Sequence, residues 1–508
     1  MEDLNQVLRI RREKLATLRE KGFEPFAYRF DFTHRATGAT AAFAEAEEAG
    51  TLTEAGHGPQ VRVAGRLVAW RSHGKSAFAH LEDPSGRIQL YFKKDLLGEE
   101  TFAALDLLDL GDWLGVEGPL FRTRTGEVTV HVASWTLLSK SLRPLPFGKV
   151  DVDPDSGEKR THSGFADTQA RYRQRYADLA VHPEVREVFR KRARIITELR
   201  AFLDGEGFLE VETPALQPLY GGASARPFVT THNALERTLY LRIADELYLK
   251  RLIVGGLDRV YEISKDFRNE GIDRFHNPEF TMLEWYQAFA DYGDQMDLVE
   301  RMVVHVADKV LESRTFTFGE HRISVEPPFR RVRLVDALSE ALKEDVHDMP
   351  DGELRRRAEK LEIPELAGAG RGKLIDKLFG ELVEPSLIQP TFVLDHPKEL
   401  SPLAKPKRGE PHLTERFELY MAGMEVFNAF SELNDPLDQR ERFEAQAALR
   451  AEGDDEAQPV DDDYLRALEY GLPPTGGVGM GVDRFVMLLL DQASIRDVIL
   501  FPILRTDE

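Results

Sequence analysis

The stretch from Val260 to Tyr286 limits most strongly what this chain can fold into. Its first residues are β formers, Asn269 and Gly271 are typical turn residues, and β formers return near Phe280. The pattern predicts two strands joined by a loop. Charged side chains interleave with the aromatic ones along this stretch, at Arg268, Glu270, His276, Glu279 and Glu284. By themselves, these charges favour a solvated hairpin with some salt bridges.

Composition restricts the class of protein and of partner. The 508 residues are 42% hydrophobic and 31% charged, which indicates a globular chain of two or three domains. The formal net charge of −21 repels nucleic acid at long range, so any RNA site must be a local basic patch. The chain has no cysteine, which excludes disulfides, thiol nucleophiles and cysteine-based zinc sites.

The sequence also predicts a location for the protein. The first residues are acidic and polar, unlike a signal peptide, and no apolar run is long enough to span a membrane. We therefore expect a cytoplasmic protein without membrane contact.

Residues 1–58 are expected to form a helical arm and connector. Apolar residues at helical spacing predict an amphipathic helix over Leu4–Lys21, with arginines and lysines on its other face. Such a face suits contact with an RNA backbone and suits water equally well, so both alternatives stay open. Alanine-rich residues 30–58 predict a helical connector.

Residues 59–147 show a period of two, which is typical of strands. Five short strands, with a helix over 95–107 after the third, predict an OB-fold barrel. Barrels of this kind bind single-stranded nucleic acid by stacking bases on aromatic rings beside polar and basic groups. The candidates for this role are Arg71, Phe78, Gln89 and Glu127. Taken alone, Phe78 is more easily interpreted as a core residue.

Residues 148–169 are predicted to be a linker, and residues 170–508 a second domain. A basic helix over Glu184–Leu203 is followed by glycines and a strand ending at Pro214. Residues from about 332 to 384 are mostly polar and helical in pattern, and we interpret them as an insertion.

Several residues of the second domain suit nucleotide chemistry. Arg268 and Arg484 lie at loop or junction positions, where fixed cations stabilise charge on phosphate oxygens. Glu418 and Glu425 are predicted on adjacent strands, and carboxylates in such positions suit Mg²⁺. Phe280 offers a face on which adenine can stack. These residues form one site only if the fold brings them together.

Three strings carry a resemblance to a known family. Phe267-Arg-Asn-Glu, a short loop and His276-Asn-Pro-Glu-Phe resemble motif 2 of class II aminoacyl-tRNA synthetases. The helix, glycine and strand ending at Pro214 resemble motif 1, and the glycine-rich strand that runs into Arg484 resembles motif 3. Asn277-Pro-Glu-Phe-Thr and its surroundings are similar to the lysyl members. The resemblance covers nearly the whole chain and implies an α+β fold, in which an OB-fold barrel precedes a catalytic domain built on an antiparallel sheet flanked by helices.

The resemblance also implies an activity. ATP and L-lysine would form lysyl-adenylate and pyrophosphate, and lysine would then pass to the 3′ end of tRNA(Lys), with Mg²⁺ but no zinc, in a homodimer. The implied catalytic residues are Arg268 and Arg484. The implied ATP-binding residues are Arg268, Glu270, His276, Asn277, Phe280, Glu418 and Arg484. The implied lysine-binding residues are Gly222, Glu246, Arg268, Glu284, Tyr286, Asn428 and Glu432. The implied metal ligands are Glu418 and Glu425, and the implied anticodon-binding residues are Arg71, Phe78, Gln89 and Glu127.

The chain departs from the family pattern at a few positions. Asp245 replaces a common proline, and we expect it to cap the following helix and to change only loop geometry. Trp70 stands where a basic residue is frequent in the barrel, and Phe427 replaces a small residue beside the lysine site. Without the motif, Glu432 is better interpreted as a cap of the turn at Asn434-Asp435-Pro436.

Three rival functions are compatible with parts of the pattern. An aspartyl or asparaginyl enzyme of the same subclass needs cationic or amide groups in its pocket, whereas Glu432 suits an amine. A non-catalytic paralogue usually loses the motif arginines or the metal carboxylates, which are present here. A protein-lysylating paralogue lacks the barrel that is predicted for residues 59–147.

Overall fold

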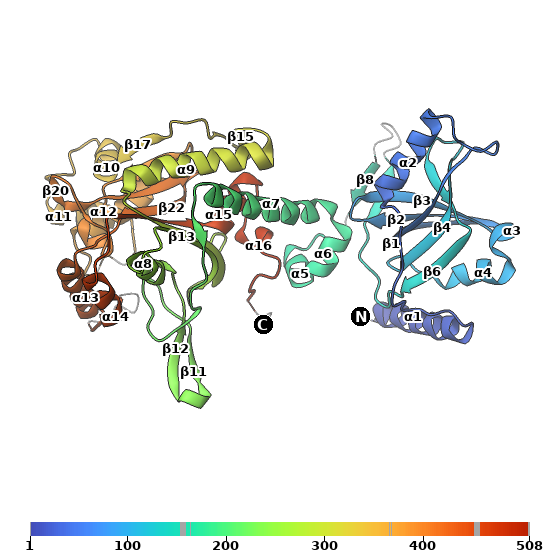
Figure 1. Cartoon of the computed structure of the whole chain (residues 1–508), viewed down its shortest axis with the longest axis horizontal. Helices are drawn as coiled ribbons and strands as arrows, with labels where there is room; N and C mark the ends of the chain where they lie inside the picture. Colours follow the sequence, from blue (N-terminus) through green and yellow to red (C-terminus); the bar gives the residue numbers. More distant parts are fainter. Residues whose placement is uncertain are drawn as a thin grey trace. The chain divides into compact units, whose positions relative to one another are not determined.

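The computed structural model describes residues 2–152, 159–162, 164–364, 366, 368–451 and 458–505. The chain divides into two compact units, residues 1–181 and 182–508 (Figure 1). The sequence predicts that the second domain starts at residue 170, whereas the structure divides the chain between residues 181 and 182. None of the helices in the described ranges combines the length and the apolar character that crossing a bilayer requires.

The first unit is a small β-barrel with helices around it. Its elements are α1 (Glu2–Glu20), α2 (Ala36–Glu48), β1 (His57–His73), β2 (Ser76–Asp83), β3 (Gly86–Lys93), α3 (Lys94–Leu97), α4 (Glu99–Ala103), β4 (Trp113–Arg122), β5 (Val128–His131), β6 (Ser134–Ser139), β7 (Lys149–Val152), β8 (Lys159–His162), α5 (Thr168–Arg173) and α6 (Arg175–Val181). The main sheet has the order β1-β2-β3-β5-β4-β6, and β1 also pairs with β4, so the sheet closes on itself. The predicted barrel is confirmed.

Apolar side chains at alternate positions of the strands fill the interior of the barrel. Val61, Val63 and Leu67 of β1 are buried together with Leu90 of β3 and Leu114 of β4. The side chains between them face outward, because successive residues of a strand point to opposite sides of the sheet.

Two predictions for the first unit, one of a helix and one of a linker, need correction. The helix predicted over 95–107 is broken into short pieces at Gly98, whose φ of 80° ends α3. The predicted linker contains the β7–β8 hairpin, while its residues 153–158 and 163 lie outside the described residues.

Helix α1 confirms the prediction for Leu4–Lys21 and uses part of its basic face inside the unit. The Arg11 guanidinium is buried and donates to the carbonyl oxygens of Ser141, at 2.8 Å, and Leu110, at 3.1 Å. Lys14 Nζ lies 2.8 Å from a carboxylate oxygen of Asp109. These two cations are therefore structural, while Arg9 and Arg12 remain exposed.

The second unit is built on one large sheet. Its elements are α7 (Pro183–Gly205), β9 (Leu209–Glu210), β10 (Leu216–Gln217), β11 (Val229–His232), β12 (Arg237–Leu241), α8 (Glu246–Val254), β13 (Arg259–Phe267), β14 (Glu279–Ala288), α9 (Tyr292–Val306), β15 (Thr315–Phe318), β16 (His321–Ser324), β17 (Arg330–Arg333), α10 (Leu334–Leu342), α11 (Asp351–Lys360), α12 (Arg371–Leu382), β18 (Thr391–Leu394), β19 (Pro406–Lys407), β20 (Glu410–Thr414), β21 (Arg416–Met421), β22 (Met424–Ser431), α13 (Pro436–Ala451), α14 (Asp462–Glu469), β23 (Thr475–Gly481), α15 (Val482–Leu489) and α16 (Ile495–Val498). The sheet order is β17-β18-β21-β22-β23-β14-β13-β9.

This sheet is antiparallel through its centre, as expected, but its two outermost pairs are parallel. The strand predicted over residues 208–214 shrinks to β9, which pairs parallel with β13. Strands β23, β14, β13 and β9 are neighbours in this order, so the three motif strings lie side by side.

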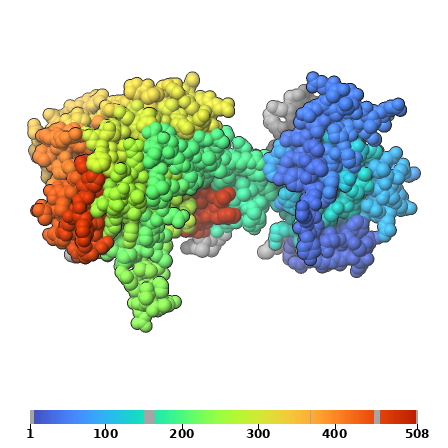
Figure 2. Space-filling model, viewed as in Figure 1, coloured from blue at the N-terminus to red at the C-terminus, as the bar shows by residue number. Residues whose placement is uncertain are grey.

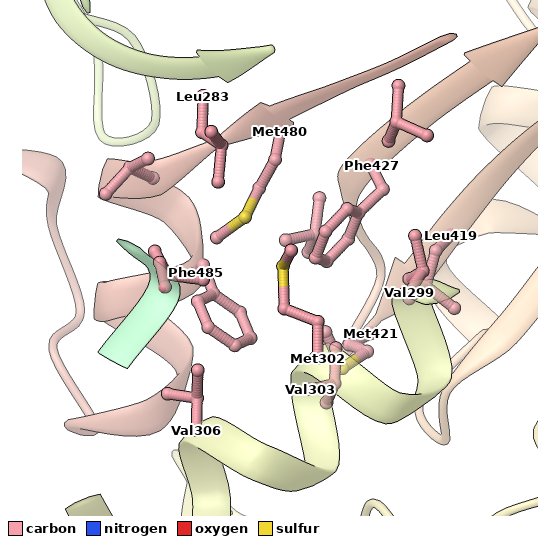
Figure 3. Packing of buried hydrophobic residues seen from close by; sticks show 14 of the residues in the cluster. Leu283, Val299, Met302, Val303, Val306, Leu419, Met421, Phe427, Met480 and Phe485 are labelled. Carbon is pink, nitrogen blue, oxygen red and sulfur yellow. The ribbon is translucent and has the colours of Figure 1, made fainter. Parts of the chain in front are cut away.

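One face of the sheet is covered by helices. In Figure 3, Phe427 and Met480 of the sheet pack against Phe485 of α15 and Met302 of α9. The rings of Phe427 and Phe485 lie 6.0 Å apart. Phe427 is fully buried on this face, so it fills the core and does not line the cavity on the other face of the sheet.

Two parts of the second unit stand apart from this core. Helices α10, α11 and α12 have a hydrophobic cluster of their own that includes Leu338, Leu354 and Leu378. The β11–β12 hairpin extends away from the rest of the unit as the green projection of Figure 2. Its residues Val229 and Leu235 are exposed.

Candidate active site

A cavity of about 450 Å³ lies in the second unit, on strands β14, β21, β22 and β23. Every residue that the sequence assigns to ATP, lysine or metal lines it. These residues are Gly222, Glu246, Arg268, Glu270, His276, Asn277, Phe280, Glu284, Tyr286, Glu418, Glu425, Asn428, Glu432 and Arg484. They come from distant parts of the chain, so the fold supplies the convergence that the sequence cannot show.

The first strand pair of the site follows the prediction for Val260–Tyr286. Strands β13 and β14 pair from Arg259 opposite Gln287 to Phe267 opposite Glu279, and the loop begins at Arg268. The Arg268 guanidinium lies 5.0 Å from the centre of the Phe280 ring, and its Nε and Nη2 each lie 3.4 Å from the carbonyl oxygen of Ile243. A flat aromatic face and a fixed cation therefore share one side of the cavity.

A second cation, Arg484, lies in the first turn of helix α15. Arg484 Nη1 donates to the Glu425 carbonyl oxygen at 3.0 Å, and its Nη2 lies 2.9 Å from His276 Nε2. His276 Nδ1 lies 2.8 Å from an Asp273 carboxylate oxygen, which fixes the orientation of the ring. Asn277 Oδ1 is buried and has no hydrogen-bond partner in the described part of the chain. Together these groups offer donors to anionic oxygens and one free acceptor.

The carboxylates Glu418 and Glu425 lie on the adjacent strands β21 and β22, as predicted. Glu418 Oε1 lies 2.5 Å from Arg416 Nη2, and its Oε2 accepts from the Tyr420 hydroxyl at 2.7 Å. Burial opposes ionisation of Glu418, but Arg416 and His396 hold its pKa well below the ordinary value. Burial and the charge of Glu418 raise the pKa of Glu425. Two carboxylates that repel each other in this way fit a divalent cation such as Mg²⁺, whose charge relieves the repulsion.

A buried ion-pair network forms the far end of the cavity. Lys250 Nζ lies 2.6 Å from Glu246 Oε1 and 2.5 Å from Glu432 Oε2. Glu432 is 1% exposed, and its Oε1 has no hydrogen-bond partner among the described residues. A Cβ at Gly477 would stand 2.2 Å from this oxygen, so only glycine fits there. A buried carboxylate oxygen without a partner is costly, and a ligand cation would satisfy it.

Glu284 and Tyr286 of β14 lie beside this end. The Tyr286 hydroxyl donates to Glu284 Oε2 at 3.1 Å. One carboxylate oxygen of Glu284 lies within 4.8 Å of one from each of Asp245 and Asp266. Burial and these two acidic neighbours raise the pKa of Glu284 well above its ordinary value.

The prediction that Asp245 caps a helix and changes only loop geometry is wrong. Its side chain makes no capping hydrogen bond to α8. It is fully buried instead, where it accepts from the Ser264 hydroxyl at 2.6 Å and pairs with Arg242 at 3.1 Å. Burial and the neighbouring Asp266 and Glu262 raise its pKa well above the ordinary range.

Gly222 and Asn428 complete the wall. Gly222 has a φ of 89°, and a Cβ there would lie 3.0 Å from the Ala244 side chain. Its N–H donates to Gln458 Oε1 at 3.2 Å. Asn428 Oδ1 accepts from Arg416 Nε at 3.2 Å, which leaves its amide NH₂ for other partners.

The alternative interpretation of Glu432 as a turn cap does not hold. Asp435 Oδ1 accepts from the N–H groups of Leu437, at 2.9 Å, and Asp438, at 3.4 Å, at the start of α13. Glu432 instead points to Lys250 and lines the cavity.

The predicted anticodon residues lie on the outer face of the barrel. Arg71 is opposite Phe78, and Phe78 is opposite Tyr91, across three neighbouring strands. Phe78 is half-buried, and its ring centre lies 4.8 Å from that of Tyr91, so it is not part of the barrel core. Gln89 Nε2 donates to Glu127 Oε2 at 2.5 Å. Trp70 packs inward against Phe92, so it does not belong to this face.

Sequence reasoning missed three residues of the cavity region and one of the barrel. These are Lys250, Arg416, Gln458 and Tyr91. Three of them carry a usable signal; Lys250 follows Glu246 by one helical turn, and Tyr91 follows Gln89 at strand spacing. Arg416 precedes Glu418 at the same strand spacing, whereas Gln458 reaches Gly222 only through the tertiary fold.

Comparisons with known proteins agree with this geometry. The family model of class II tRNA synthetases (D, K and N) matches residues 167–505, and the model of the OB-fold nucleic acid binding domain matches residues 61–138. The lysine–tRNA ligase of Carboxydothermus hydrogenoformans is 50% identical over 505 residues, which cover 99% of both chains. That of Moorella thermoacetica is 51% identical over 100% of this chain and 99% of its own. The chain therefore belongs to the class II tRNA synthetases of the D, K and N group.

Proposed function

We propose that this protein is a lysine–tRNA ligase, which activates L-lysine with ATP and transfers it to tRNA(Lys). The observation that carries the proposal is the far end of the cavity, where the buried carboxylate Glu432 has one oxygen without a hydrogen-bond partner among the described residues. The similarity to lysine–tRNA ligases over the full length of the chain supports it. An aspartyl or asparaginyl enzyme would need cationic or amide groups at this end.

In the proposed complex, ATP occupies the end of the cavity that holds the arginines. Adenine stacks on Phe280, Glu270 and Asn277 contact the adenine and nearby groups, His276 approaches the phosphates, and Arg484 pairs with the γ-phosphate. Arg268 lies between the two substrates, where it neutralises both the lysine carboxylate and the α-phosphate. The carboxylate then attacks the α-phosphorus in line, and pyrophosphate leaves.

No side chain of this chain needs to become a covalent nucleophile. The cavity contributes orientation of the reacting atoms and fixed positive charge where negative charge develops. Mg²⁺, held by Glu418 and Glu425, would add charge neutralisation on the phosphate oxygens.

Lysine occupies the other end. Glu246 pairs with its α-ammonium and Glu432 with its ε-ammonium, while Gly222, Glu284, Tyr286 and Asn428 surround the side chain. Each ammonium needs an anionic partner where water is excluded. The unpartnered Glu432 oxygen supplies one such partner.

The remaining parts of the proposal concern partners and location. The outer face of the barrel, with Arg71, Phe78, Gln89 and Glu127, would bind the anticodon of tRNA(Lys). The enzyme would act as a homodimer in the cytoplasm, as the resemblance to class II synthetases implies.

Pyrophosphate exchange tests the activation step directly. The purified protein, incubated with ATP, Mg²⁺ and labelled pyrophosphate, should form labelled ATP when lysine is added and should need no tRNA. Aspartate and asparagine should give exchange at background level. Exchange that depends on aspartate or asparagine instead of lysine would refute the proposed substrate.

A further inference from the structure

Lys250 contacts both carboxylates, Glu246 and Glu432, at the end of the cavity proposed to bind lysine, and it lies outside the cavity lining. Its side chain is fully buried, and its ammonium contacts Glu246 at 2.6 Å and Glu432 at 2.5 Å. Both glutamates are among the cavity-lining residues, whereas Lys250 is not, within the described part of the chain. Lys250 therefore contacts the two glutamates that line the cavity and does not itself line the space that a substrate would fill.

This contact uses only part of each carboxylate. Lys250 occupies Glu432 Oε2 and leaves Oε1 without a partner, beside the space that Gly477 keeps open. When one oxygen of a carboxylate is held by an ion pair, the position of its second oxygen is also fixed. Glu246 lies one helical turn before Lys250 on α8, so the helix itself sets the distance between them.

The groups around Lys250, Glu246 and Glu432 affect the charge state of these three residues. Among the described residues, the other titratable or charged groups that face this network are Tyr464 of α14, whose ring centre lies 5.8 Å from Lys250 Nζ, Tyr286 and Glu284 of β14, and Arg416 of β21. Burial raises the pKa of Glu432 to about 8, and Lys250 opposes this rise. Burial also opposes the charge of Lys250, but Glu246 and Glu432 together hold its pKa well above the ordinary value.

We propose that Lys250 is a positioning residue for substrate specificity, which holds Glu246 and Glu432 in fixed orientations and directs the free oxygen of Glu432 toward an ammonium group of the amino-acid substrate. The inference rests on the proposed function and deepens it. Without Lys250, burial would raise the pKa of both carboxyl groups further, so a substrate ammonium would have to displace a proton more often.

The test measures pyrophosphate exchange at varied lysine and ATP for Lys250→Met and for Lys250→Gln, which keeps a hydrogen-bond donor and most of the volume. At pH 7.5 both variants should raise the KM for lysine tenfold or more and change the KM for ATP less than twofold. The KM for lysine should fall as pH rises, and this fall should occur at higher pH than in the wild type. Arg251 is on the same helix as Lys250 and pairs with Asp461 outside it. As a control, Arg251→Met should leave the dependence of the KM for lysine on pH unchanged.

A double-mutant cycle separates positioning from mere stability. Glu432→Gln alone should raise the KM for lysine about a hundredfold, and adding Lys250→Met should raise it by a smaller factor than Lys250→Met does in the wild type, because one of the two groups that Lys250 positions has already lost its charge. Equal losses in both backgrounds, or an unchanged pH profile with only a lower melting temperature, would overturn the inference. If the wild type shows lysine-dependent exchange and the Lys250 variants match it, the inference fails while the proposed function stands. Absence of exchange in the wild type would instead refute the proposed function.

Discussion

Single carboxylates around the cavity differ in protonation because their neighbours differ. Arg416 and His396 keep Glu418 ionised despite its burial, so it is available to a metal ion. Glu284 has only acidic groups among the charges that chiefly shift its pKa, and burial adds to their effect, so it holds a proton more readily. The same residue type is therefore ionised at one end of the cavity and holds a proton more readily near the other.

The buried acidic cluster should make stability depend on pH. Burial raises the pKa of Asp266 to about 6 and that of Asp245 well above its ordinary value. The folded state then binds more protons than the unfolded state between pH 4 and 6, so the stability that these groups contribute is present below pH 4 and is lost as pH rises through about 6. Each pKa unit corresponds to about 1.4 kcal/mol.

Asp245→Asn tests this dependence. The variant should melt at a higher temperature than the wild type at pH 8 and at nearly the same temperature at pH 4.5, because the amide cannot ionise. Asp348→Asn, which changes an exposed residue, serves as the control and should leave the difference between the two pH values unaltered. A lower melting temperature for Asp245→Asn at pH 8 would show that the ion pair with Arg242 outweighs the repulsion.

Elements, rather than single residues, decide which predictions from sequence succeed. Strands β13 and β14 and the loop between them follow from local residue preferences, so Arg268 and Phe280 could be placed before the fold was known. The burial of Asp245 could not, because its partners Ser264 and Asp266 lie on a strand that meets it only in the tertiary fold. The parallel edges of the large sheet depend on long connections, about which local pattern carries no information.

The outer face of the barrel is also a property of several strands. Alternation places Phe78, Tyr91 and His131 on neighbouring strands with their side chains on one side. The ring centres of Phe78 and Tyr91 lie 4.8 Å apart, and those of Tyr91 and His131 lie 5.4 Å apart. A row of this kind offers successive stacking surfaces for unpaired bases.

Phe78→Ala tests the proposed anticodon contact. Loss of one stacked base costs about 1–3 kcal/mol, so the KM for tRNA should rise roughly fivefold to a hundredfold. Lysine-dependent pyrophosphate exchange without tRNA should not change. Phe102→Ala, which removes a ring packed against the barrel core, is the control for lost packing. A parallel fall in exchange, or unfolding of the Phe78 variant, would favour a structural role.

At the scale of the whole molecule, the two units divide the proposed work. The cavity and its charges belong to residues 182–508, and the aromatic face belongs to residues 1–181. The net charge of −21 means that tRNA must be attracted locally, by surfaces such as the barrel face, against the field of the whole chain. Activation of lysine should therefore depend little on salt, and transfer to tRNA should weaken as salt rises.

Charging of tRNA measures the central claim most directly. The protein is incubated with ATP, Mg²⁺ and total bacterial tRNA, and each of the twenty amino acids is supplied with a label in a separate reaction. We predict that lysine alone becomes attached to tRNA, that the attachment requires an intact 3′ end, and that tRNA(Lys) is the species charged. Charging with aspartate or asparagine, or the absence of lysyl-tRNA when lysine-dependent exchange is present, would contradict this account.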